Sequence, residues 1–369
     1  MVRSPASRSS RATRPPVGRP GPAVRDFRGS TASYRIEWDV RTLYDFIFSL
    51  SDDAGATEDM PAADRRWLAE ARTALPELVR ADRDALLASE VCIQIAESIV
   101  ELPDISTPGE FVAALRAMEP RAAVRTLASD LFQDGASAAL ADRAIDGDRD
   151  AIERVIEATP EYHRLATTEI LRDPLGLVAR LIGVLDAWQR PFAEIEPRLR
   201  AMLERDVEAR SEDARTLAPG DLIERTTGGL RFLPEPGVRR VILAPSYFAR
   251  PYNFLFSKDD WRLYGYPIAD SALDSGDPLE PPPAVIRLHR ALGDPSRLRV
   301  LRLLADGDRY LTEIAQALEL SKPTVKHHMA QLRAAGLVTL TQEGSLTYYS
   351  LRRDRLDEVG TDLRRFITT

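Results

Sequence analysis

Three consecutive prolines at 281–283 are the feature that most constrains how this chain can fold. They close a segment, residues 270–283, that also contains Asp277-Pro278 and several small polar residues. Proline lacks a backbone N–H and fixes one backbone dihedral angle, so consecutive prolines stay extended and no helix can cross them. We therefore expect a Pro-rich linker at 270–283 between a long N-terminal part and a C-terminal domain at 284–369.

The C-terminal domain begins with the spacing and turn signals of short consecutive helices. Apolar residues at intervals of three and four predict a helix from residue 284, and Pro295 suits the first turn of a second helix. Asp306-Gly307-Asp308 predicts a turn, and Thr312 is then a suitable N-cap for a third helix.

The next predicted helix, at about 322–335, has one apolar face and one face of polar or small side chains. Ser321 is its expected N-cap, and Gly336 is expected to end it. Short or hydrogen-bonding side chains let a helix approach base edges in the major groove, whereas bulky side chains hold it away. The apolar face carries Val325, Met329 and Leu332, and the opposite face carries Pro323, Thr324, His327, Ala330, Gln331 and Ala334.

Two strands and a last helix follow this recognition-type helix. Strands are predicted at 337–340 and 346–351, with a turn at 341–345 between them, which completes a winged helix-turn-helix. The turn contains Glu343, which places a negative charge where DNA phosphate is expected to lie. An amphipathic helix is predicted at 354–367. Because both terminal helices of this small domain carry apolar stripes, we expect them to pair in a homodimer.

Double-stranded DNA is accordingly the expected partner. Lys322 and Lys326 flank the outward face and are placed for phosphates, although the chain has just one other lysine, Lys258. Residues 284–369 carry a net charge of +4, which favours approach to DNA. The predicted DNA-binding residues are Ser321, Lys322, Thr324, Lys326, His327, His328, Gln331 and Arg333.

Charge divides the rest of the chain. Residues 1–33 hold seven arginines and one acid, a charge of +6, and few large apolar residues. Such a segment buries too little surface to offset its ordering entropy, so we predict a disordered basic tail. It is open to three interpretations: a solvated tail, an arm that touches DNA, or the product of a misassigned upstream start codon. Because the whole chain has a net charge of −7 and both of its ends are positive, residues 34–283 carry a net charge of −17.

The N-terminal part, residues 34–269, is predicted to be mostly helical, which makes the whole chain mainly α. Prolines, among them Pro191 and Pro197, are expected to divide it into short helices. Turn signals and short β-branched or aromatic runs predict a β segment at 226–268. The aromatics crowded at 246–266 have two interpretations: a small sheet that covers the helices, or the wall of a ligand pocket or dimer surface.

The C-terminal domain resembles the ArsR family of regulators. The run from Leu292 to Leu301 looks like that family's entry helix, the runs 320–329 and 332–338 resemble its recognition helix, and Tyr348-Tyr349 matches its wing. The resemblance covers about 85 of the 369 residues. It implies a homodimer that represses transcription and responds to a signal.

The N-terminal part resembles, more weakly, an uncharacterised subgroup of ArsR-like regulators. The residues that carry this resemblance are Ala244-Pro245-Ser246-Tyr247-Phe248 and Arg250-Pro251. The resemblance names no ligand, so the effector is unknown. We expect this part to be a regulatory, sensing domain rather than an enzyme.

Two alternatives to a sensor remain at this stage, an enzyme or a protein-interaction domain fused to a DNA-binding module. No catalytic constellation can be assembled, because Ser246 has no assignable histidine partner and no phosphate-loop motif is present. No stretch approaches 18 apolar residues, so no membrane segment is expected. A single cysteine, Cys92, suits a reducing cytoplasm. No cofactor is expected.

Metal sensing is not expected either. Metal sensors of the family carry paired cysteines on the helix before the recognition helix, or Asp/His clusters on the terminal helix. Here 312–320 has no cysteine and 354–367 has no histidine. His327 and His328 are adjacent, so they point about 100° apart and cannot easily share one metal.

We therefore predict that zinc, cadmium and arsenite leave DNA binding unchanged, because thiolate pairs and histidine clusters are missing. Titration of each metal during a duplex-binding measurement, with a chelator-treated sample as the control, checks this. A tight stoichiometric complex that releases DNA would overturn it.

Overall fold

The computed structural model describes residues 34–368 apart from 53, 55–58, 89–94, 128–137, 160–163, 259, 274–278, 280 and 344–345. Within these residues helices predominate over strands, so the fold is mainly α, as the sequence predicts. The predicted tail at 1–33, Cys92 and the centre of the predicted linker lie outside the described residues.

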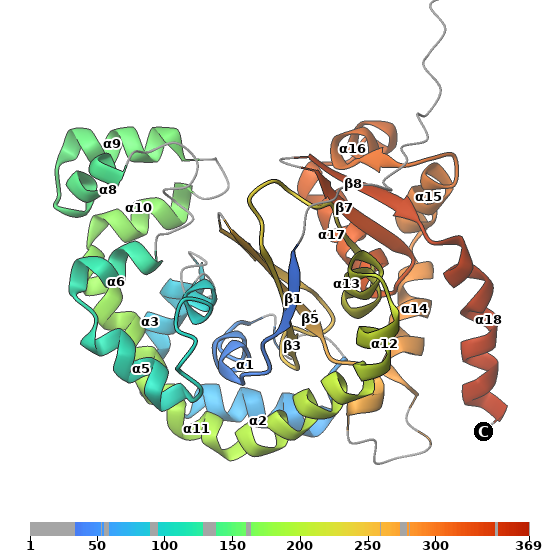
Figure 1. The fold of residues 1–369 in the computed structure, drawn as a ribbon, viewed down its shortest axis with the longest axis horizontal. Helices are drawn as coiled ribbons and strands as arrows, with labels where there is room; N and C mark the ends of the chain where they lie inside the picture. Colours follow the sequence, from blue (N-terminus) through green and yellow to red (C-terminus); the bar gives the residue numbers. More distant parts are fainter. Residues whose placement is uncertain are drawn as a thin grey trace, which may run out of the picture.

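The N-terminal part and the C-terminal domain lie side by side (Figure 1). The N-terminal part contains β1 (Arg35–Trp38), α1 (Leu43–Phe48), α2 (Ala62–Thr73), α3 (Glu77–Ala88), η1 (Ile95–Ile99), α5 (Pro108–Ala117), α6 (Pro120–Leu127), α8 (Ala138–Ile145), α9 (Arg149–Ala158), α10 (Arg164–Arg172), α11 (Pro174–Ala209), α12 (Ser211–Thr216), α13 (Pro219–Thr227), β2 (Leu230–Phe232), β3 (Arg240–Ser246), β4 (Phe254–Ser257), β5 (Trp261–Pro267) and η3 (Asp270–Ala272). The C-terminal domain contains α14 (Pro283–Leu292), α15 (Pro295–Leu304), β6 (Arg309–Tyr310), α16 (Leu311–Leu318), α17 (Lys322–Ala334), β7 (Val338–Glu343), β8 (Leu346–Leu351) and α18 (Arg353–Thr368).

Helix α11 is the long element along the lower edge of Figure 1. It passes through Pro191 and Pro197, so the expectation that these prolines separate short helices is wrong. A proline inside a helix removes one hydrogen bond and costs about 3 kcal/mol. Burial of an apolar face offsets this cost, because each fully buried large apolar side chain contributes about 1.5–3 kcal/mol. That face carries Leu181, Val184, Leu185, Trp188, Phe192, Ile195, Leu199, Met202 and Leu203.

A four-stranded sheet in the order β1-β3-β5-β4 occupies the centre of the N-terminal part. Strands β1, β3 and β5 are parallel, and β4 is antiparallel to β5. The strands predicted within 226–268 are confirmed as β2 to β5, but β1 was not predicted. Strand β1 is four residues long and lies at an edge of the sheet, where a short strand carries little periodicity.

The sheet has an apolar core on each face, because alternate residues of β3 point in opposite directions. Ile242 and Ala244 join the core formed with α1 and α11, whereas Val241 and Leu243 join a second core with α13 and β2. The aromatics of 246–266 are mostly buried in these two cores, which supports the first of their two interpretations. The buried members are Tyr247, Phe248, Phe256, Trp261, Tyr264 and Tyr266.

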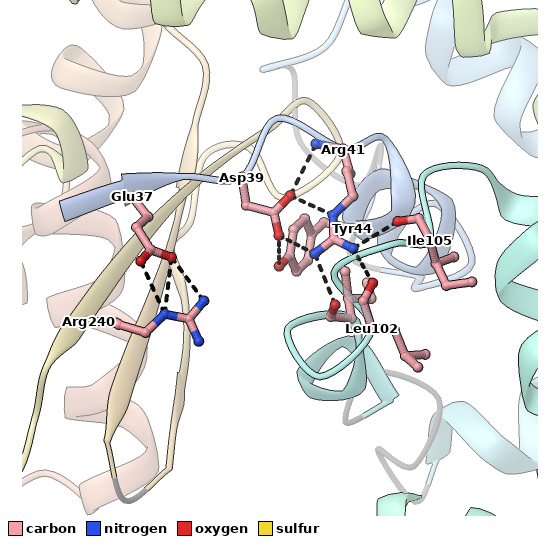
Figure 2. A network of polar contacts seen from close by, with 8 residues as sticks. Glu37, Asp39, Arg41, Tyr44, Leu102, Ile105 and Arg240 are labelled. Atoms are coloured by element: carbon pink, nitrogen blue, oxygen red, sulfur yellow. Dashed lines mark hydrogen bonds and ion pairs between the residues drawn. The ribbon is translucent and has the colours of Figure 1, made fainter. Parts of the chain in front are cut away.

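The segment after β1 is fixed by the side chain of Arg41 (Figure 2). Its Nε and Nη2 donate to the carboxylate of Asp39 at 2.8 and 2.6 Å. Its Nη1 donates to the carbonyl oxygens of Leu102 and Ile105 at 2.7 and 2.8 Å. Asp39 also accepts from the hydroxyl of Tyr44 at 2.8 Å. These contacts tie the end of β1 to the loop before α5.

The elements predicted for the C-terminal domain are present. The recognition-type helix is α17, the two predicted strands are β7 and β8, and the last helix is α18. The prediction of Thr312 as the third N-cap is wrong, because α16 begins at Leu311 and Tyr310 is its N-cap. Glu313 causes the earlier start, since its carboxylate accepts from the backbone N–H of Tyr310 at 2.9 Å.

The second sheet, in the order β2-β7-β8-β6, contains strands from both sides of the predicted linker. Strand β2 runs parallel to β7, with Leu230 opposite Leu340. The carbonyl oxygen of Gly229 accepts from the N–H of Leu340 at 2.8 Å. Leu340 also packs against the core that contains Ile223 and Leu230. The N-terminal part is therefore attached directly to the wing.

We predict that Gly229→Ala lowers the free energy of unfolding by about 1–3 kcal/mol. Gly229 has φ +118°, and an added Cβ would lie 3.1 Å from the carbonyl oxygen of Val338, so alanine would strain the junction with β7. Urea unfolding followed by circular dichroism measures the effect. The control is Gly220→Ala in α13, where a Cβ meets nothing within 4 Å. Equal unfolding midpoints for the two variants would contradict the prediction.

Candidate DNA-binding site

The turn between α16 and α17 is set by local backbone contacts. Glu319 ends α16 in the left-handed conformation, with φ 57° and ψ 39°, and the N–H of Leu320 donates to the carbonyl oxygen of Ala315 at 3.0 Å. Ser321 then caps α17, because its Oγ accepts from the N–H of Thr324 at 3.3 Å. The predicted N-cap at Ser321 is confirmed, and it fixes where α17 begins.

The apolar face of α17 holds the helix in place. Val325, Met329 and Leu332 are each at most 1% exposed and lie in the core of the C-terminal domain. This core also contains residues of α14, α15 and α16. The prediction that these three side chains share a buried face is confirmed, so the opposite face of α17 is directed away from this core.

The N-terminal half of α17 presents polar side chains to solvent. Lys322, Thr324, Lys326 and His327 are all exposed. The hydroxyl groups of Thr324 and Ser321 lie 2.7 Å apart and share a hydrogen bond. Cationic side chains suit phosphate oxygens, and hydroxyl and imidazole groups suit base edges. The structure brings Ser321 and these four residues together at the N-terminal end of α17, and their contact with DNA stays a prediction.

Two other predicted DNA contacts, His328 and Arg333, have less access to solvent. Nδ1 of His328 and Nη1 of Arg333 are buried. The pKa of His328 lies below its ordinary value because burial lowers it by more than Asp294 raises it. The pKa of Arg333 is likewise lowered by burial, although Tyr349 raises it. A guanidinium buried beside the wing is poorly placed for a phosphate, so the position of Arg333 differs from the expectation.

The last predicted contact, Gln331, bonds to the N-terminal part. Its Nε2 donates to the hydroxyl oxygen of Tyr252 at 2.7 Å, and both side chains are half-buried. Tyr252 lies between β3 and β4, in residues 247–253, which we call the 247–253 loop. Tyr252 is one of the aromatics noted at 246–266, but no local pattern indicates a contact across 79 residues of sequence.

Arg250, in the same loop, connects it to the start of the C-terminal domain. Its side chain is 2% exposed, and it pairs with Asp270 and donates to the carbonyl oxygen of Asp59 at 3.2 Å. Oδ2 of Asp270 accepts from the N–H of Ala284 at 2.8 Å, at the first turn of α14. Arg287 of α14 pairs with Asp59 and lies 3.6 Å from Asp270. Burial by itself raises the pKa of Asp270, but the guanidinium groups of Arg250 and Arg287 lower it by more. The pKa of Asp270 therefore lies below its ordinary value.

The other end of the loop is held by a buried carboxylate, that of Asp45 in α1. Its Oδ1 accepts from the hydroxyl of Ser246 at 2.6 Å and from the N–H groups of Tyr247 and Phe248 at 2.9 and 2.8 Å. Burial raises the pKa of Asp45 from 3.8 to about 6, although these hydrogen bonds lower it. The 247–253 loop is thus attached to α1 at one end and to α17 and α14 beyond it.

The wing consists of β7 and β8, which pair in register from Val338 with Leu351 to Glu343 with Leu346. The side chains of 342–346 lie outside the described residues, so the position of the Glu343 carboxylate at the wing tip stays a prediction.

The residues that the structure describes contain no group of three or more His, Cys, Asp and Glu side chains that could hold a metal ion. The rings of His327 and His328 are 6.2 Å apart, centroid to centroid. In the same part of the chain, no helix combines the length and apolar character that crossing a membrane requires.

Comparison with known proteins places the helix-turn-helix in a family. The model of the bacterial regulatory proteins of the arsR family matches residues 294–339. An HTH-type transcriptional regulator of Methanocaldococcus jannaschii is 37% identical over 73 residues, which are 82% of that protein and 20% of this chain. The chain belongs to the ArsR family.

Two further relatives match a similar share of this ArsR-family chain. The HTH-type transcriptional regulator CmtR of Mycobacterium tuberculosis is 42% identical over 73 residues, 62% of its length and 20% of this chain. The transcriptional repressor SdpR of Bacillus subtilis is 35% identical over 69 residues, 77% of its length and 19% of this chain. ArsR-family regulators bind double-stranded DNA, so the C-terminal domain is that of a DNA-binding regulator.

We predict that Asp45 makes stability fall as pH rises. Its carboxyl binds a proton more tightly in the folded chain than in the unfolded chain, so its contribution is fully present below about pH 4 and is lost through about pH 6. The loss is on the order of 3 kcal/mol. Asp45→Asn removes the titration, so the difference in unfolding free energy between wild type and this variant should change by that amount from pH 4 to 7.

Urea unfolding at each pH measures this difference, and Asp104→Asn, at an exposed position, is the control for loss of a carboxylate. A difference between wild type and Asp45→Asn that stays constant with pH would count against the buried titration.

Proposed function

We propose that this ArsR-family chain is a homodimeric transcriptional repressor of the cytoplasm, and that an effector acting on its N-terminal part controls DNA binding. The observation that carries the proposal is the exposed N-terminal half of α17. The opposite face of this helix is buried, and Ser321 caps its first turn. The name of the SdpR relative supports a repressor rather than an activator. The effector is an organic molecule or a protein.

Each exposed residue of α17 has a role that its chemistry supports. Lys322 and Lys326 are four residues apart, so they lie on one side of the helix and bind phosphates along the same edge of the groove. Thr324 and His327 contact base edges, because they are three residues apart and share another exposed side of the helix. Ser321 holds the first turn of the helix and positions Thr324. Sequence preference therefore comes from Thr324 and His327, whereas the lysines supply affinity for any duplex.

Helix α18 supports the homodimer. None of its described residues is fully buried, and beyond Leu356 and Val359, which pack against the core of the C-terminal domain, it carries Leu363, Phe366 and Ile367. Ile367 is 69% exposed, which is unusual for an isoleucine that has no further partner. Pairing of α18 with the same helix of a second copy would bury these side chains and set two α17 helices side by side in successive grooves.

A role without catalysis or metal is supported by how the polar groups of the N-terminal part are used. Ser246 and Asp45 are both fully buried and hydrogen-bonded to each other. A hydroxyl in that position holds the 247–253 loop rather than attacking a substrate. The acidic surface of residues 34–283 repels phosphate, which leaves the C-terminal domain to approach DNA.

The test of the DNA-binding role uses the full-length chain and a duplex from directly upstream of its own coding sequence, with a scrambled duplex of equal length. We predict that Lys326→Ala weakens binding to both duplexes and makes the slope of log affinity against log salt shallower by about 0.9 per protomer. Thr324→Ala should reduce the preference for the upstream duplex by about 1 kcal/mol or more.

Fluorescence anisotropy at several salt concentrations measures both effects. Arg302→Ala is the matched control, because Arg302 is an exposed cation of the same domain on α15 and pairs with Asp306. No duplex binding at low salt by the wild-type chain would reject the DNA-binding role, and an equal effect of Arg302→Ala would reject the assignment to α17.

A further inference from the structure

The face of α17 that carries the predicted DNA contacts is partly covered by the N-terminal part of the same chain. Thr324 and Gln331 are seven residues apart, so they lie two turns apart on one side of the helix. Thr324 is exposed, whereas Gln331 donates to the hydroxyl of Tyr252 at 2.7 Å. A duplex that lies along this side and contacts Thr324 approaches the place that Tyr252 occupies.

Tyr252 is held firmly on its own side of this contact. The N–H of Tyr252 donates to the carbonyl oxygen of Ala249 at 2.8 Å. Asn253, the next residue, donates through Nδ2 to the carbonyl oxygen of Thr227 at 3.0 Å. Arg250 and the carboxylate of Asp45 fix the rest of the 247–253 loop. The loop therefore presents the Tyr252 hydroxyl from a rigid base, and its position follows the N-terminal part.

The N-terminal part is attached to the C-terminal domain at three places that differ in strength. The pairing of β2 with β7 combines backbone hydrogen bonds with a shared apolar core. At α14, Arg287 pairs with Asp59 and Asp270, and Asp270 also accepts from the N–H of Ala284. The attachment of Tyr252 to α17 is a hydrogen bond between two neutral, half-buried side chains, and one such bond changes an equilibrium constant by about threefold to tenfold. The weakest attachment is the one at the recognition helix, so it can open while the other two stay intact.

The charge of the N-terminal part acts on phosphates at longer range than the Tyr252 contact. Residues 34–283 carry a net charge of −17, which opposes the approach of DNA to the chain as a whole. The 247–253 loop itself contains no Asp or Glu, so its effect at α17 is the occupation of Gln331 by the Tyr252 hydroxyl. The closed contact and DNA binding are thus competing uses of one helix face.

We propose that the hydrogen bond between Tyr252 and Gln331 is an autoinhibitory contact, and that double-stranded DNA competes with Tyr252 for the recognition helix. This rests on the proposed DNA-binding role of α17. The described conformation is then the low-affinity form, and an effector that draws the 247–253 loop away from α17 increases affinity for DNA, whereas one that fixes the loop lowers it.

The test compares full-length wild type, Tyr252→Phe and Tyr34→Phe for binding to the upstream and scrambled duplexes at one fixed salt concentration. Tyr252→Phe keeps the ring and removes the hydroxyl, so affinity for both duplexes should rise by about threefold to tenfold per protomer. Tyr34→Phe is the matched control, because the ring of Tyr34 packs on Phe232, away from α17, at 5.0 Å between centroids.

An affinity of Tyr252→Phe that equals or falls below that of wild type would overturn the autoinhibitory contact alone, provided that wild type binds. If none of the three chains binds either duplex at low salt, the proposed DNA-binding role fails and the contact fails with it. Binding by Tyr252→Phe but not by wild type supports both.

Discussion

The parallel pairing of β2 with β7 is the interaction on which the relation between the two parts of this chain depends. It places the end of α13 and the central sheet against the wing, with Leu340 packed into the core that contains Leu230. Because β2 follows α13 after a glycine at φ +118°, the direction of the strand is set before it reaches β7. Every other contact across the linker, including those of Arg250 and Tyr252, lies where this pairing puts it.

The sequence was sufficient wherever structure is decided by neighbours along the chain. The recognition helix could be predicted with its cap and its buried face, because Ser321 and the spacing of Val325, Met329 and Leu332 are local signals. The strands from β2 to β5 were predicted for the same reason, from turns that flank short apolar runs. The exposure of Lys322 and Lys326 follows from the same periodicity.

The remainder could not be predicted because it depends on contacts between distant residues. Pro191 and Pro197 are helix breakers by local rules, and burial of Trp188, Phe192 and their neighbours overrides these rules. The pairing of β2 with a strand about a hundred residues later leaves no periodic trace, nor does the bond from Tyr252 to Gln331. The side chains of the candidate site were therefore predicted, but the contact that the N-terminal part makes with it at Gln331 was not.

The order of the second sheet bears on how such regulators acquire long N-terminal extensions. In a winged helix without β2, β7 is the edge strand of the sheet, and its unpaired backbone groups are open to pairing with another strand. Here β2 occupies this edge and buries part of Leu340 with it. Removal of the N-terminal part would leave this edge of β7 unpaired, and its free backbone groups would then be open to pairing with a strand of another molecule. The wing thereby becomes a point of attachment as well as a part of the DNA-binding domain.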